Sequence, residues 1–149
     1  MEPQDTMPAG DDHRRPDGVD DATVAAAGKL SEALEWVERA RGHLYSLHQL
    51  IGRADFIAEE AAEELEAAGH RELAERVRTE IVGRNVLDGR WTFQIVEDFD
   101  DGYWEPFRTC ERDVRDQLLD GRRHVYEAEM KEQRRTHGAR RHASRPPEV

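Results

Sequence analysis

The stretch from Leu30 to Ile51, LSEALEWVERARGHLYSLHQLI, decides the fold class because its apolar side chains recur at helical spacing. Apolar residues three, four or seven positions apart fall on one face of an α-helix. Ser31 is predicted to cap the start of this helix and Gly52 to end it. The residues on the predicted face are Leu30, Leu34, Val37, Leu44, Leu47 and Ile51.

Two more helices are predicted between Gly52 and Arg84. The first takes Asp55 as its N-cap and ends at Gly69, and the second covers residues 71–82. Both repeat apolar residues at three or four positions, and acidic side chains cover most of the remaining surface of the first. The apolar faces consist of Ile57, Ala61, Leu65 and Ala68 in the first helix and of Leu73, Val77 and Ile81 in the second.

Residues 85–96 fit two structures. The Asp88-Gly89 pair between apolar residues is typical of a hairpin turn, and apolar side chains alternate after it. A longer helical pattern also starts near Trp91 and favours a helix capped by Asp88. Pro106 lies within that pattern and predicts a kink or break near residues 101–105. The pattern consists of Ile95, Phe99, Tyr103, Phe107, Cys110, Val114 and Leu118, and Gly121 is predicted to end it.

Charge and composition divide the 149 residues into three parts. Residues 1–29 hold seven acids and few bulky apolar side chains, so a disordered acidic tail is predicted. Residues 30–121 hold nearly all large apolar residues and form the predicted helical bundle domain. Residues 122–149 form a basic, partly helical tail, in which Tyr126 or Met130 would dock the helix. The predicted fold is all-α, a three- or four-helix bundle with a long kinked C-terminal helix and disordered tails.

The composition argues against membrane, secreted and disulfide-bonded classes. No apolar run approaches the ~20 residues of a membrane-spanning helix, and the N-terminus lacks the apolar segment of a secretory signal. The single cysteine, Cys110, excludes an internal disulfide. A cytoplasmic location is therefore expected.

The sequence lacks the spacing of common catalytic and metal sites. None of the seven histidines follows a glutamate by three positions, as a ferritin-like centre requires. The acidic stretch that starts at Asp98 places Gly102 one position too early for a calcium loop. Cys110 falls on the apolar pattern and is expected to be buried and unreactive. We therefore expect no catalytic residue, metal or cofactor, and a non-enzymatic protein is favoured.

A small polar pocket inside the bundle is the first candidate site. Polar residues interrupt or border the predicted apolar faces, and they could bind a metal or an acidic ligand if the helices brought them together. The alternative is structural, with Arg41 paired to Asp113 and the histidines hydrogen-bonded. The candidate residues are Arg41, His48, His70, Glu80 and Asp113.

An interaction surface is the second candidate site. Trp36, Phe93 and Trp104 point away from the predicted apolar faces and could anchor a second copy or another protein. The leading functional hypothesis is a non-enzymatic, cytoplasmic helical interaction or assembly protein that forms homodimers. A ligand- or metal-binding bundle is the alternative. A further alternative is nucleic-acid contact through the tail at residues 133–145, which holds five arginines and no acid.

Overall fold

The computed structural model describes residues 11–147, and this part of the chain is all-α, as predicted. It contains no strand in the described residues beyond one isolated bridge between Leu87 and Arg90. The chain divides into a first unit, residues 1–35 with 107–149, and a second unit, residues 36–106. None of the described helices combines the length and the apolar character needed to cross a membrane.

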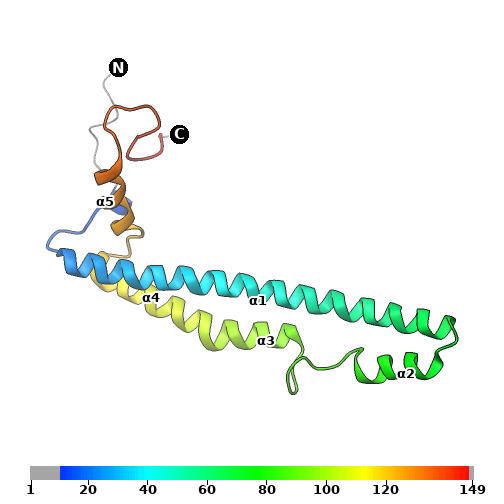
Figure 1. Ribbon diagram of the computed structural model, residues 1–149. Coiled ribbons are helices and arrows are strands. Elements are labelled where there is room, and N and C mark those ends of the chain that lie inside the picture. The colour runs from blue at the N-terminus through cyan, green and yellow to red at the C-terminus, as the bar shows by residue number, and fades with distance from the viewer. Residues whose placement is uncertain (1–10, 148–149) are drawn as a thin grey trace. The chain divides into compact units, whose positions relative to one another are not determined.

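Five α-helices and two irregular helical segments make up the described chain (Figure 1). The segment η3 has π-helical geometry and joins α3 to α4 without a loop. The elements are η2 (Asp11–His13), α1 (Asp21–Ala67), α2 (Arg71–Glu80), α3 (Thr92–Phe99), η3 (Asp100–Trp104), α4 (Glu105–Leu119) and α5 (Val125–Arg134). The predicted three- or four-helix bundle stays a prediction.

Helix α1 begins at Asp21, so the prediction of a start capped by Ser31 is wrong. Asp20 caps the helix, with its carboxylate accepting a hydrogen bond from the Thr23 N–H at 2.8 Å. Residues 21–29, assigned to the acidic tail from the sequence, are helical because Val24 and Ala27 are buried in the core of the first unit. The predicted tail over residues 1–10 lies outside the described residues.

The two helices predicted around Gly52 are one continuous helix, which corrects the predicted stop at Gly52 and the cap at Asp55. Glycine inside a helix costs only about 1 kcal/mol relative to alanine, and packing on both sides of Gly52 offsets that cost. The prediction that Gly69 ends the helix is confirmed. Gly69 has φ +91, and the N–H of His70 donates to the Leu65 carbonyl at 2.8 Å.

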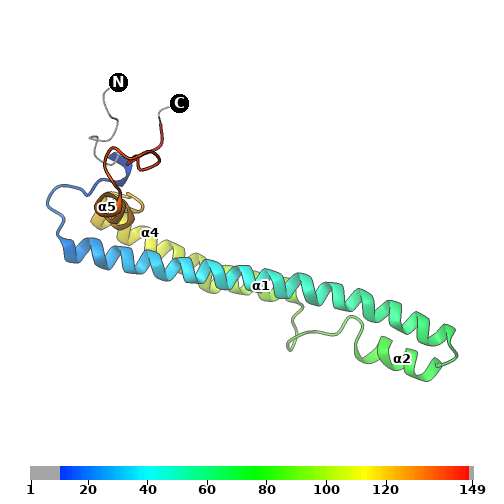
Figure 2. The ribbon, with the colours of Figure 1, turned by 45° about the horizontal axis from the view of Figure 1, so that its top comes forward.

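In the second unit, α1 buries one face against the helices that run back beside it, α2 and α3 (Figures 1 and 2). The residues of this face that are not exposed repeat at alternating intervals of four and three, the heptad pattern of packed helices. We call this set the buried seam. It consists of Val37, Arg41, Leu44, His48, Ile51, Asp55, Ala58, Ala62 and Leu65.

Residues 85–96 contain parts of both structures that their sequence fits, a tight turn followed by the start of a helix. Leu87 and Arg90 pair across a tight turn in which Gly89 has φ +66. Helix α3 then starts at Thr92, and the Trp91 N–H donates to the Gln94 side chain at 2.8 Å. Asp88 therefore forms part of the turn and does not cap the helix.

The π-helical turn changes which aromatic side chain faces α1. The Glu105 N–H donates to the Asp100 carbonyl, five residues earlier, so the turn holds one more residue than an α-helical turn. Tyr103, predicted on the apolar face, is consequently 52% exposed, whereas Trp104 is half-buried. A kink at this place stays a prediction.

The first unit is built around a small apolar core of Val24, Ala27, Leu119 and Val125. Val125 is buried in this core and docks α5. Tyr126, predicted for that role, is half-exposed but packs against Gly28 of α1, whereas Met130 is exposed. Gly121, with φ +72, follows the end of α4 as predicted.

Cys110 is exposed, which corrects its predicted burial. Glu111 takes the inner position of α4, four residues after Phe107, and only 6% of its surface is exposed. Its carboxylate accepts hydrogen bonds from the Ser31 hydroxyl at 2.9 Å and from Arg115 Nε at 2.7 Å. These two donors compensate for the burial of its charge.

Candidate functional site

Arg41, the first predicted pocket residue, forms a two-pronged ion pair with Asp100 in the second unit. Its Nε and Nη2 atoms donate to Oδ1 and Oδ2 at 2.8 and 3.0 Å. The guanidinium also lies over the Trp104 ring, 3.7 Å from the ring centroid. The hydrogen bonds from Arg41 lower the pKa of the Asp100 carboxyl below its ordinary value, because they stabilise its charged form.

The other polar residues of the buried seam also have partners inside the second unit. His48 Nδ1 lies 2.7 Å from the hydroxyl of Thr92, the buried first residue of α3. The Asp55 carboxylate accepts a hydrogen bond from the Gly83 N–H at 2.8 Å. Because each polar residue is satisfied, the contacts favour the structural interpretation of Arg41 and His48.

The remaining pocket candidates lie elsewhere. His70 is exposed before the first residue of α2, Glu80 binds Arg76 on the surface at 3.0 Å, and Asp113 is exposed on α4 of the first unit. The partner of Arg41 is Asp100, not Asp113 as the structural alternative expected. Among the described contacts, none joins two of the five candidate side chains. A pocket in which all five converge stays a prediction.

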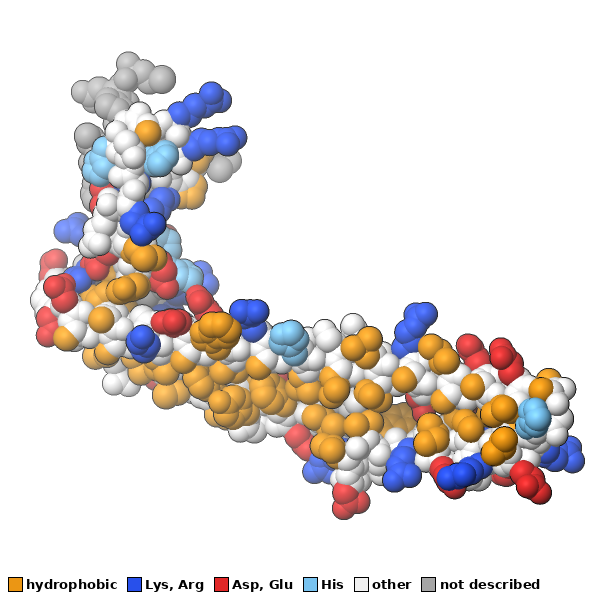
Figure 3. All heavy atoms as spheres, in the orientation of Figure 1, with side chains coloured by type: hydrophobic (Ala, Val, Ile, Leu, Met, Phe, Trp, Pro, Cys, Tyr) orange, Lys and Arg blue, Asp and Glu red, His pale blue; other side chains and the backbone are white. Residues whose placement is uncertain are grey.

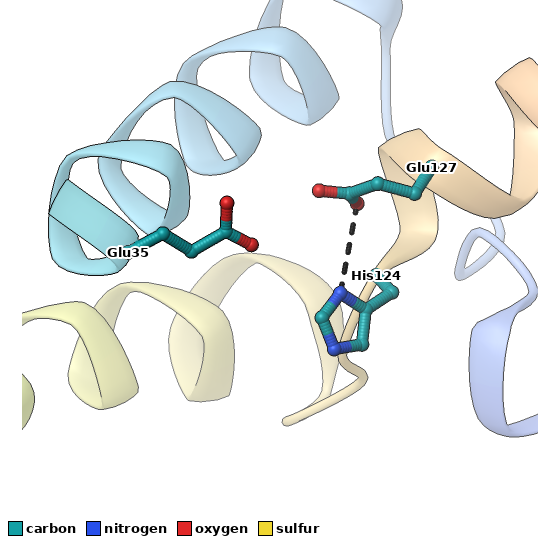
Figure 4. Close-up of side chains that lie close together, drawn as sticks. All are labelled: Glu35, His124 and Glu127. Atoms are coloured by element: carbon teal, nitrogen blue, oxygen red, sulfur yellow. Dashed lines mark ion pairs between the residues drawn. The ribbon is translucent and has the colours of Figure 1, made fainter. Parts of the chain in front are cut away.

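Three residues of the first unit form a group that sequence analysis missed, Glu35, His124 and Glu127 (Figure 4). Their ligand atoms lie within 4.8 Å of one another, and His124 Nδ1 is 3.9 Å from Glu127 Oε2. One imidazole with two carboxylates is a donor set that suits zinc and related ions. Glu35 and His124 are exposed, and exposed acidic groups commonly lie together without a metal. The group therefore carries no function by itself.

The three predicted interface aromatics divide into two kinds. Trp36 is 61% exposed and Phe93 is 46% exposed, where it packs edge-on against Trp91. Trp104 instead faces its own unit, because its Nε1 donates to Glu38 at 2.9 Å and its ring contacts Arg41. Only Trp36 and Phe93 are thus open to a partner in the way the sequence predicts.

A second heptad pattern lies on the open side of α1. It begins with Trp36, and each of its residues immediately precedes one residue of the buried seam, so its direction differs by about 100°. All of its residues are exposed, including Leu50 at 67%, and all but one are apolar. We call this set the exposed seam. It consists of Trp36, Ala40, His43, Leu47, Leu50, Ala54, Ile57 and Ala61.

Several large apolar side chains of α1 and Leu73 of α2 are exposed in the second unit, and Figure 3 shows hydrophobic side chains at the surface of both helices. Arg39, Arg53 and Glu60 flank the exposed seam on the edge away from the buried seam, and all three are exposed. A long apolar strip with a charged edge is the arrangement of a helix–helix interface.

No protein-family model, curated protein or solved structure matches this chain.

Proposed function

We propose that this chain is a non-enzymatic helical interaction protein that assembles with itself through the exposed seam of α1. The observation that carries the proposal is the presence of two heptad patterns on one helix, one buried and one open. A helix that packs inside a single protein needs one apolar face, so a second face of equal regularity indicates a second helical neighbour.

The energetics of the exposed seam support this proposal. Trp36, Leu50 and Ile57 are exposed to water. Burying each of these large side chains against a partner would contribute roughly 1.5–3 kcal/mol of free energy to association. The seam extends over the 26 residues from Trp36 to Ala61, or about 39 Å of helix. Scattered apolar side chains on a surface need no explanation, but a strip of this length, interrupted only by His43, does.

The polar contacts of the buried seam support an interaction role over the ligand-binding alternative. Arg41, His48 and Asp55 are occupied by Asp100, Thr92 and the Gly83 backbone, so they have a structural task already. The nucleic-acid alternative stays a prediction. One of the arginines on which it depends, Arg135, is 3% exposed and paired with Glu132 at 2.6 Å. The cytoplasm remains the proposed location, on the basis of the single cysteine.

Light scattering coupled to size-exclusion chromatography tests the proposal. The wild-type chain at tens of micromolar should elute with a mass above that of one chain, and the mass should fall on dilution. Leu50→Glu places a charge at the centre of the exposed seam and should give a monomer. Leu73→Glu is the matched control, because Leu73 is 54% exposed on α2 outside the seam, and this variant should assemble as the wild type does. A wild-type chain that is monomeric at every concentration would contradict the proposal.

A further inference from the structure

We infer that two copies of this chain pair through their exposed seams with the α1 helices antiparallel, so that Leu47 of each copy faces Leu50 of the other. This inference rests on the proposed function and adds the identity of the partner, the direction of pairing and the register. It is carried by the order of large and small residues along the seam and by the charges at its edge.

Side-chain size alternates along the exposed seam in a way that only opposite directions can match. Large side chains occupy one heptad position, Trp36, His43, Leu50 and Ile57. The other position holds Ala40, Leu47, Ala54 and Ala61. Two parallel copies in register would place like against like, which leaves empty layers of alanine between crowded layers of tryptophan and histidine. Antiparallel copies place each large residue opposite a residue of the other set.

The register follows from the same pattern. When helices run in opposite directions, a step forward on one copy is a step backward on the other. With Leu47 opposite Leu50, Trp36 then faces Ala61, Ala40 faces Ile57 and His43 faces Ala54. Every layer therefore pairs two leucines or one large side chain with one alanine, which is the complementarity that close packing requires.

The charged edge agrees with this register. Arg39 of each copy is level with residue 58 of the other, two residues or about 3 Å along the axis from Glu60. The two long side chains span this offset, so the dimer contains this ion pair twice. The remaining edge position pairs Arg53 with the uncharged Ser46. Edge charges of opposite sign stabilise one pairing of helices over others.

These patterns point to a second copy of this chain rather than to a different protein. A two-fold interface requires that each group on the surface find its complement on the same surface, at an equal distance from the axis. Around the centre between Leu47 and Leu50, the exposed seam meets this condition for side-chain size in every layer, and its edge meets it for charge at Arg39 and Glu60. Because the two seams of α1 differ by about 100°, α1 can contact α2 and α3 on one side and the second α1 on the other.

Exchanging the edge charges tests the register. Arg39→Glu and Glu60→Arg should each weaken dimerisation at low salt by roughly five- to tenfold, because each creates two like-charge contacts in a dimer. The double variant Arg39→Glu with Glu60→Arg restores opposite charges and should recover wild-type affinity to within about twofold. Arg76→Glu is the control, because it changes an exposed charge on α2 outside the interface. Recovery that fails in the double variant would overturn the register.

Spin-label distances test the direction independently. Single labels at Gln49→Cys and at Glu59→Cys, in a Cys110→Ser background, lie on exposed positions of α1 outside the interface. In the antiparallel register the two labels at position 49 should be nearly level, whereas those at position 59 should be separated along the axis by about 32 Å. Short distances at both positions would overturn the antiparallel arrangement and leave the proposed self-association intact. A chain that never dimerises would overturn both.

Discussion

Replacing Arg41 by methionine should destabilise the second unit more than the loss of any surface charge. The side chain donates two hydrogen bonds to Asp100 at 2.8 and 3.0 Å and covers the Trp104 ring at 3.7 Å. Methionine keeps an unbranched apolar stem similar to the aliphatic part of arginine, so the change removes mainly the charged guanidinium group. Asp100 would be left half-buried without its cation.

The magnitude follows from these contacts and their exposure. A hydrogen bond to a charged group contributes a net ~1.5–3 kcal/mol when well buried. The Arg41 and Asp100 side chains are 24% and 21% exposed, so we take about 2 kcal/mol for the pair. Stacking on Trp104 adds about 0.5 kcal/mol. Arg41→Met should therefore lower the free energy of unfolding by about 2.5 kcal/mol.

Urea unfolding followed by circular dichroism measures this loss, in a Leu50→Glu background that removes any contribution from self-association. A double-mutant cycle with Asp100→Asn should give a coupling free energy of about 1.5 kcal/mol. Arg76→Met is the control. It removes an exposed ion pair with Glu80 and should cost at most ~0.5 kcal/mol. A coupling free energy no larger than that of the control would refute the structural role assigned to Arg41.

Three further outcomes follow from the structure. Because Arg41 lowers the pKa of Asp100, the Asp100 charge stabilises the fold above the ordinary carboxyl pKa of about 4. The difference in free energy of unfolding between wild type and Asp100→Asn should therefore shrink as the pH falls through and below that value, as acid titrations of both proteins would show. Gly69→Ala should lower the free energy of unfolding by about 1 kcal/mol, because Gly69 has φ +91. Gly42→Ala should raise it by about 0.5–1 kcal/mol, because Gly42 is helical with open space beside it. Thermal unfolding that gives both variants a change of the same sign would contradict the assigned backbone conformations. The exposed Cys110 thiol of the native chain should react with a thiol reagent at a rate within about tenfold of free cysteine, and a reaction that requires denaturant would show that it is buried.

The periodicity of apolar residues predicts the all-α class, and glycine chemistry predicts the ends of helices at Gly69 and Gly121. Local signals fail at Ser31 and Gly52, where packing overrides them. Ser31 lies inside α1 and donates to Glu111, and Gly52 lies between packed residues of the buried seam. A capping residue or a glycine affects only the few residues next to it. The core contacts of Val24 come instead from α4 and α5, far along the chain, so local signals do not predict that the helix starts before Ser31.

In the candidate sites too, the sequence predicts part of the arrangement and long-range packing decides the rest. The sequence places Arg41 and His48 within the apolar face of α1. It does not predict the π-helical turn that brings Asp100 and Trp104 to Arg41, nor Thr92 as the partner of His48. The helical spacing of the sequence also predicts Leu44 and Leu47 on one face. The structure separates them, because Leu44 belongs to the buried seam and Leu47 to the exposed seam. Two heptad patterns one residue apart are read from sequence as a single broad face, and only burial distinguishes them.

Sedimentation equilibrium of the wild-type chain tests most directly whether the exposed seam is an interface between copies. At tens of micromolar, the measured mass should approach twice the chain mass of 17.2 kDa and return to 17.2 kDa in the Leu50→Glu variant. A wild-type mass of 17.2 kDa at every concentration, or a dimer that Leu50→Glu leaves unchanged, would contradict the assignment of the exposed seam as the surface of assembly.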